Sequence, residues 1–164
     1  MEHLWAPWRM AYILGDETKD GGCIFCACPS DPQRHRERLV LAVTEHALVM
    51  LNKFPYNNGH LMVAPRRHVA DPADLPDDEH RALGELLRRA TRVVRSVLRP
   101  EGMNVGMNLG RAAGAGIDAH CHWHVVPRWN GDTNFMPVVG DVKVVAEYLT
   151  ASYDRLLPSF GPET

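Results

Sequence analysis

The 164-residue sequence lacks an apolar run long enough to cross a lipid bilayer, and its first residues lack the apolar core of a secretion signal. Both absences predict a cytoplasmic protein with no membrane partner. Neither sign of charge prevails, because 18 basic and 20 acidic side chains leave a formal net charge of −2. This balance predicts no nucleic-acid partner, since a basic surface usually supplies that attraction. Convincing repeats and low-complexity tracts are also absent, so we expect one domain with a short extension.

Cysteine is scarce, and its four copies are Cys23, Cys26, Cys28 and Cys121. In a cytoplasmic protein, thiols bind metals or stay reduced more often than they form disulfides. The two-residue spacing of Cys23 and Cys26 lets both thiolates bind one tetrahedral zinc ion from a tight turn. One such pair is half a zinc site, and Cys28 is an alternative ligand that lies awkwardly close to Cys26. A pair of reduced thiols without metal is the competing interpretation.

Hydrophobic periodicity predicts the strands and helices. The clearest element is a helix over 77–98, where apolar residues recur every three or four positions and three acidic residues occupy the first turn. Short apolar runs predict strands over 39–43, 47–51, 60–64, 103–109 and 119–127, and a second helix is expected over 141–157. We therefore expect an α+β fold, a mainly antiparallel sheet with a long helix and a C-terminal helix. An N-terminal arm and zinc-type turn would occupy 1–38, and the main domain 39–164.

Three histidines, His120, His122 and His124, alternate with other residues on a run that we expect to be a strand. Side chains alternate between the faces of a strand, so the three imidazoles should share one face. The residues between and after them should face the core: Cys121, Trp123 and Val125. A purely structural role would desolvate three imidazoles without apolar gain. A histidine–metal site and a site for phosphate chemistry are the functional alternatives.

A glycine-rich stretch, residues 110–116, precedes the histidines and favours phosphate chemistry. Its small residues Gly114, Ala115 and Gly116 allow successive backbone N–H groups to point at anionic oxygens. A neutral imidazole is nucleophilic near pH 7 and forms a labile phosphoramidate. The central residue, His122, has a histidine on each side that can donate a proton, so we expect it to be the nucleophile.

These motifs resemble the histidine-triad (HIT) superfamily over most of the chain. The resemblance is carried by His120–Arg128, by Gly59–Pro65 with the preceding Asn52, and by Asn104–Gly110. The segments Leu4–Met10 and Pro127–Phe135 further resemble the fragile-histidine-triad branch, and within it the bacterial diadenosine tetraphosphate phosphorylases. This resemblance implies a HIT-like fold, a homodimer, a nucleotide substrate and no organic cofactor.

The resemblance also implies roles for individual residues. His122 would carry the nucleotidyl group, His124 would contact the scissile phosphate, and His60 would support the histidines. Asn52 would lie near the ribose, and Asn108 near the α-phosphate. Unlike many relatives, this chain has no Gln, Ser or Thr just before the triad, where the sequence reads Ala115-Gly116-Ile117. Only backbone N–H groups are then available there, unless the charge of Arg111 compensates.

By the same resemblance, His68 and His120 would complete a Cys2His2 zinc site with Cys23 and Cys26. Such a site is structural, and it would tie the N-terminal segment to the catalytic strand. Trp129 lies just past that strand, so two interpretations stay open: it borders the substrate by stacking on a base, or it packs in the core.

The expected activity is cleavage of dinucleoside polyphosphates of the diadenosine tetraphosphate type through a nucleotidyl-His122 intermediate. We expect inorganic phosphate as the acceptor in the second step. The alternatives are hydrolysis of dinucleoside polyphosphates or nucleoside phosphoramidates and, from another class, a nucleotide-binding sensor with vestigial activity.

Overall fold

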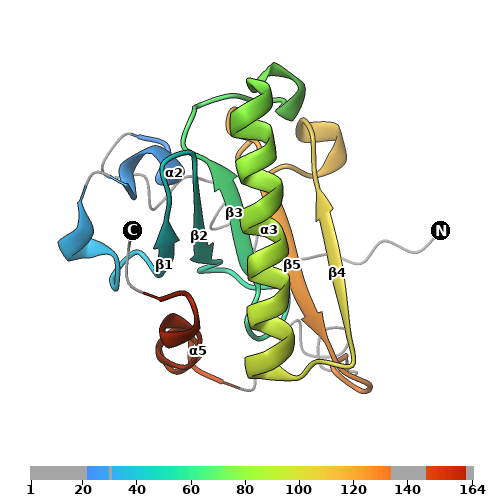
Figure 1. Ribbon diagram of the computed structural model, residues 1–164. Helices are drawn as coiled ribbons and strands as arrows, with labels where there is room; N and C mark the ends of the chain where they lie inside the picture. The colour runs from blue at the N-terminus through green and yellow to red at the C-terminus, as the bar shows by residue number, and fades with distance from the viewer. Residues whose placement is uncertain (1–21, 30, 134–146, 162–164) are drawn as a thin grey trace.

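The computed structural model describes residues 22–29, 31–133 and 147–161. Their strands form one five-stranded antiparallel sheet in the order β1-β2-β3-β5-β4 (Figure 1). The strands are β1 Val40–Val43, β2 Ala47–Leu51, β3 Leu61–Pro65, β4 Gly102–Met107 and β5 Trp123–Arg128. With its helices, this sheet confirms the predicted α+β class and the mainly antiparallel sheet.

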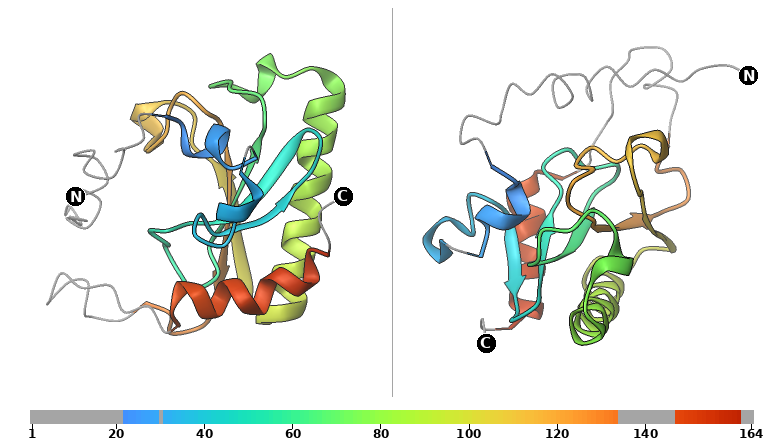
Figure 2. Two further views of the ribbon diagram at one scale, coloured as in Figure 1. Left: turned by 90° about the vertical axis from the view of Figure 1, so that its left-hand side faces the viewer. Right: turned by 90° about the horizontal axis from the view of Figure 1, so that it is seen from above.

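Both faces of the sheet are covered, which is why β2 and β3 are buried along their whole length. Alternate residues divide between two cores. Val49 and Val63 belong to the larger core, which lies between the sheet and the long helix α3. Met50 and Met62 belong to a smaller core with Phe25, which lies in the short helix α2 Ile24–Ala27. Figure 2 shows the segment with α2 on the side of the sheet opposite α3.

Helix α3 spans Asp77–Leu98, as the sequence predicted. Its buried residues form one stripe against the sheet: Leu83, Leu86, Ala90, Val93, Val94 and Leu98. The helix ends at Arg99, which has a left-handed backbone with φ 50° and ψ 51°, and Pro100 follows. None of the helices in the described part of the chain is long and apolar enough to span a bilayer.

Glycine is required where the β2–β3 turn passes the end of α3. Gly59 has a φ of +69°, and a Cβ atom there would lie 2.2 Å from Cδ1 of Leu98. A larger residue would strain this left-handed backbone and would force the side chain of Leu98 to shift.

The predicted triad strand, 119–127, is corrected to Trp123–Arg128, because residues 120–122 leave the sheet. There the backbone N–H of Cys121 donates a hydrogen bond to the Val69 carbonyl at 2.7 Å. The ring of His122 forms a hydrogen bond with the carbonyl of His120, two residues earlier in the chain. The partner strand β4 consequently ends at Met107, which pairs with Trp123, and not at residue 109 as predicted.

The C-terminal helix is α5, Leu149–Leu156, followed by a 3-10 turn over Leu157–Ser159. Its Tyr153 hydroxyl donates to the Val40 carbonyl at 2.9 Å, which joins α5 to β1. The predicted start at residue 141 lies outside the described residues, as do residues 1–21 of the predicted N-terminal arm, with Trp5 and Trp8. The division at residue 38 stays a prediction, although Phe25 and Cys28 pack on the sheet.

Candidate functional site

Two cysteines and two histidines from distant parts of the chain converge at one point. The ligand atoms of Cys23, Cys26, His68 and His120 all lie within 4.8 Å of one another. Sγ of Cys23 lies 3.2 Å from Nδ1 of His120, and Sγ of Cys26 lies 3.2 Å from Nδ1 of His68. The two Nδ1 atoms are 3.3 Å apart. Zinc bonds of about 2.0–2.3 Å in a tetrahedron imply donor separations of about 3.3–3.8 Å. The donor set therefore fits a closed zinc site.

The surroundings orient these ligands toward the shared point. The Nε2–H group of buried His120 donates to the Pro65 carbonyl at 2.8 Å, which leaves Nδ1 as the metal-binding nitrogen. Partial burial and the neighbouring Cys23 raise the pKa of the Cys26 thiol to about 11. Cys28 points elsewhere, since its thiol donates to the Ile24 carbonyl at 3.0 Å. Its role as an alternative ligand finds no support.

His122 lies next to this cluster and is only 4% exposed. Its Nδ1–H group donates to the His120 carbonyl at 2.9 Å, so Nε2 is the unprotonated nitrogen. Burial lowers the pKa of His122, which keeps the ring neutral near pH 7. A neutral ring with its Nε2 lone pair available has the form that a nitrogen nucleophile needs.

A second pair of histidines lies beside His122. The backbone N–H of Tyr56 donates to Nδ1 of His60 at 3.0 Å, so the proton of the neutral His60 ring is on Nε2. That Nε2–H donates to Nδ1 of His124 at 2.9 Å, which places the His124 proton on its own Nε2. The ring centroids of His122 and His124 are 4.8 Å apart. The ring of His122, whose Nε2 can accept a proton, thus lies beside the ring of His124, whose Nε2–H can donate a hydrogen bond.

The loop between β4 and β5 uses some of the donors that the sequence assigned to phosphate. Residues Arg111–Ala113 form a 3-10 turn, and the N–H groups of Gly114 and Ala115 donate to the carbonyls of Arg111 and Gly110. Of the predicted donors, Gly116 has no such bond within the described chain. The side chain of Arg111 pairs with Asp118 at 2.6 Å, so its charge is already compensated. Phosphate binding by this loop stays a prediction that rests on Gly116.

The remaining predicted site residues lie in different surroundings. Asn108 follows β4, and its Nδ2 is 4.0 Å from where a Cβ of Gly114 would stand, so it lies beside the loop. Asn52 is half-buried in the β2–β3 turn, where its Oδ1 accepts the N–H of Phe54 at 2.9 Å. Trp129 is half-buried and packs against the large core. This placement favours the packing interpretation of Trp129 over stacking on a base.

Two aromatic residues of the site were missed by the sequence analysis. Phe25 is fully buried, and its ring centroid lies 5.0 Å from that of His120 and 4.9 Å from that of His122. Tyr56 stacks on His60, with ring centroids 4.7 Å apart. The position of Phe25 between the two cysteines was the available signal, but its contact with His122 depends on the fold.

Asp132 also belongs to the framework of the site. Its carboxylate accepts from Arg128 at 2.7 Å and from Asn57 in the β2–β3 turn at 2.7 Å. The hydrogen bond from Arg128 holds the pKa of Asp132 far below its usual range. The ionised carboxylate therefore ties the loop after β5 to the turn that precedes His60.

Comparisons with known proteins agree with this geometry. The HIT domain family matches residues 33–131. The chain is 41% identical over 155 residues to a Mycobacterium tuberculosis protein named "AP-4-A phosphorylase", covering 91% of this chain and 79% of that one. Among solved structures, a "ZN-bound histidine triad family protein" from Mycobacterium smegmatis superposes with a TM-score of 0.65 and 27% identity, covering 85% of this chain and 94% of that chain.

Proposed function

Since this chain belongs to the HIT domain family, we propose that it is an enzyme that cleaves dinucleoside polyphosphates by nucleotidyl transfer through His122. The observation that carries the proposal is the pair of neighbouring imidazoles with complementary proton positions. Nε2 of His122 is an acceptor, whereas Nε2 of His124 is a donor. The name of the Mycobacterium tuberculosis relative supports diadenosine tetraphosphate as the substrate type.

In the first step, Nε2 of His122 attacks a phosphorus atom of the substrate. A nitrogen–phosphorus bond forms as a phosphorus–oxygen bond breaks, and the second nucleotide leaves as an anion. The Nε2–H group of His124 stabilises the phosphoryl oxygens. The hydrogen bond from His60 to Nδ1 of His124 holds that donor in place. The carbonyl of His120 stabilises the positive charge that develops on the His122 ring.

In the second step, an acceptor attacks the nucleotidyl group and His122 is regenerated. With inorganic phosphate as acceptor, the product is a nucleoside diphosphate; with water, it is a nucleoside monophosphate. We propose phosphate, because the relative is named as a phosphorylase and the loop before the triad has no Gln, Ser or Thr side chain that would orient water.

The choice of acceptor is tested by the products of diadenosine tetraphosphate. Incubation with phosphate is expected to yield ADP and ATP, and omission of phosphate should reduce turnover at least about tenfold. Labelled phosphate should appear in ADP. Formation of AMP and ATP at the same rate with or without phosphate would identify a hydrolase and leave the role of His122 intact.

We further propose that Cys23, Cys26, His68 and His120 hold a structural zinc ion. When bound, the ion would supply cross-linking between the N-terminal turn and the segment before β5, not Lewis-acid chemistry on the substrate. The zinc-bound relative from Mycobacterium smegmatis supports this assignment.

Phe25 is expected to position His122 in the reaction. In Phe25→Leu, the lost ring leaves space beside the imidazole, so kcat should fall about tenfold with KM within about twofold. Zinc content should stay at the wild-type level, because the ligands are unchanged. Phe160→Leu is the matched control, since Phe160 is equally buried but packs in the large core. An equal loss of kcat in both variants would reduce Phe25 to a packing residue.

A homodimer is expected to form through β4, which is an edge strand of the described sheet (Figure 1). Its Val105 is 43% exposed, and Leu109 just beyond it is 45% exposed. An exposed apolar edge is a template for pairing with a second copy. Light scattering at micromolar concentration should give twice the chain mass of 18.4 kDa, and Val105→Glu should shift the protein toward the monomer. A strictly monomeric wild-type protein would contradict this prediction.

A further inference from the structure

The arginines of α3 differ from the other arginines that the structure describes. The guanidinium group of each described arginine outside α3 donates a hydrogen bond to a carboxylate or a backbone carbonyl. These arginines are Arg34, Arg36, Arg38, Arg66, Arg67, Arg111, Arg128 and Arg155. The arginines of α3 and its C-cap have no ion pair or side-chain hydrogen bond to a described residue: Arg81, Arg88, Arg89, Arg92, Arg95 and Arg99. Arg89 lies over the ring of Phe160, with its Cζ 5.7 Å from the ring centroid. No ion pair with a described residue therefore neutralises the charge of these six arginines, which is gathered on one element.

Most of these arginines form a single row. Positions 81, 88, 92, 95 and 99 are separated by seven, four, three and four residues, which places them on one face of a helix. That face is opposite the buried stripe that contains Ala90 and Val94, and all of its arginines are exposed. At 1.5 Å per residue, the row is about 27 Å long.

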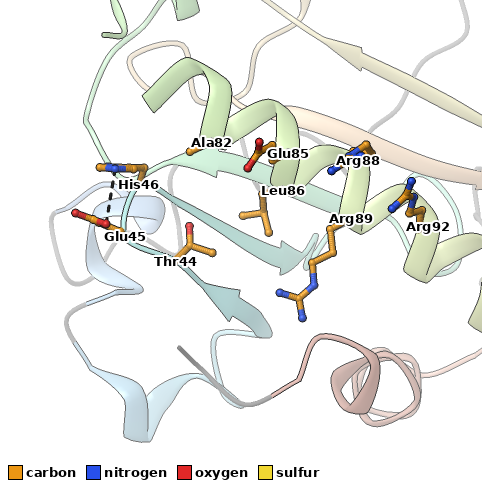
Figure 3. A pocket seen from close by; sticks show the side chains of 9 residues that line it. All are labelled: Thr44, Glu45, His46, Ala82, Glu85, Leu86, Arg88, Arg89 and Arg92. Carbon is orange, nitrogen blue, oxygen red and sulfur yellow. Dashed lines mark ion pairs between the residues drawn. The ribbon is translucent and has the colours of Figure 1, made fainter. Parts of the chain in front are cut away.

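A hollow of about 430 Å³ lies beside the middle of this row. Figure 3 shows Arg88, Arg89 and Arg92 along α3 at one side and His46 in the β1–β2 turn at the other. Two acidic side chains line the same hollow: Glu85 lies on α3 among the arginines, and Glu45 lies in the β1–β2 turn beside His46. The hollow is formed by α3 and the β1–β2 turn, so it is separate from the histidine site.

The chemistry of the surface selects the partner. No described residue of α3 is among the large exposed hydrophobic side chains, so this face does not suit insertion into a membrane. Guanidinium groups bind phosphate oxygens in a bidentate manner, and a row of them fits an extended phosphate chain better than a single nucleotide. A flexible single strand can follow a straight ridge and release its counterions along it.

We propose that the exposed face of α3 binds single-stranded nucleic acid through its phosphate backbone. The row has no aromatic side chain for base stacking, so the binding is independent of base sequence and depends strongly on salt. The net charge of −2 predicted no nucleic-acid partner. A sum over the whole chain does not show that positive charge is concentrated on one helix.

The test is fluorescence anisotropy of a labelled 20-nucleotide oligothymidine across a range of salt concentrations. If four or five phosphates are neutralised, the slope of log K against log salt is about −3. Arg88→Glu with Arg92→Glu should weaken binding at least about tenfold at low salt and reduce the size of the slope by about 1.4. Glu85→Gln should strengthen binding about two- to threefold, because it removes a like charge to the strand.

The matched control is Arg34→Glu with Arg155→Glu, which changes the net charge equally but lies outside α3. It should retain most of the affinity. Equal weakening in both double variants would attribute binding to overall charge and overturn the proposal. Displacement of the oligonucleotide by excess ADP would assign the binding to the histidine site and overturn the proposal. Absence of binding at 50 mM salt would also refute the proposal. Preference of the same face for phosphatidylglycerol vesicles over oligothymidine would identify a membrane surface instead.

Discussion

Replacement of His122 by glycine is expected to lower kcat for diadenosine tetraphosphate by about 10⁴-fold or more, because in the proposed mechanism this one imidazole carries the covalent step. In the proposed mechanism the unprotonated Nε2 of this ring is the nucleophile, and the hydrogen bond from its Nδ1–H to the His120 carbonyl holds the ring in the required tautomer. Neither of the two other histidines described beside it can replace it. Nε2 of His124 carries a proton, and both ring nitrogens of His60 are used in hydrogen bonds, Nδ1 with the Tyr56 N–H and Nε2 with His124.

The variant must be separated from a misfolded protein. Circular dichroism and zinc content should match the wild type, since glycine removes a ring and leaves the metal ligands intact. Added imidazole should restore part of the activity, because it can enter the space beside Phe25 and act as a free nucleophile. Histidine replacement on the surface of α3, His80→Ala, should leave kcat unchanged. Full activity of His122→Gly, or label from a trapped dinucleotide on another residue, would refute the mechanism.

Loss of the proposed zinc site is expected to have the largest effect on stability. Purified wild-type protein should contain about one zinc per chain, and Cys23→Ser should lose it. The thermal midpoint should then fall by at least about 10 °C, because a structural zinc contributes several kcal/mol and each kcal/mol is about 2–4 °C for a chain of this size. Turnover below the new midpoint should fall less than in His122→Gly, since the proposed zinc ion has a structural role and takes no part in the reaction.

Cys28→Ser is the control for this experiment. Cys28 is buried and donates to the Ile24 carbonyl, outside the cluster of ligand atoms, so this variant should keep its zinc. Elemental analysis and differential scanning calorimetry of the three proteins decide the matter. A wild-type protein that is free of metal after zinc-replete expression would contradict the assignment, and zinc loss in Cys28→Ser would return Cys28 to the ligand set.

Local features of the fold could be predicted because they depend on residues close in the chain. The period of apolar residues in 77–98 predicted α3 to the residue, since helical spacing is itself a local repeat. The strands β1, β2 and β3 were also predicted to within one residue at each end. The ends of β4 and β5 were wrong, because the bond from Cys121 to Val69 bridges residues that are distant in sequence.

The candidate site shows the same division. The alternation of His120, His122 and His124 predicted a histidine site from neighbouring residues alone, and the spacing of Cys23 and Cys26 predicted half of a zinc site. The resemblance to relatives supplied His60 and His68. The sequence could not show that Phe25 touches the ring of His122, or that the loop amides of Gly114 and Ala115 are already used.

By itself, therefore, the sequence determined the fold class, the long helix, the histidine triad and the cysteine half of the proposed zinc site, because periodicity and spacing are local. Only the tertiary structure decided the proton positions of the histidines and which charges are paired. Arg36 pairs with Asp154 across 118 positions, whereas Arg88 and Arg92 find no described partner. Such pairing depends on which distant groups meet after burial, and this information is not contained in any short window of the chain.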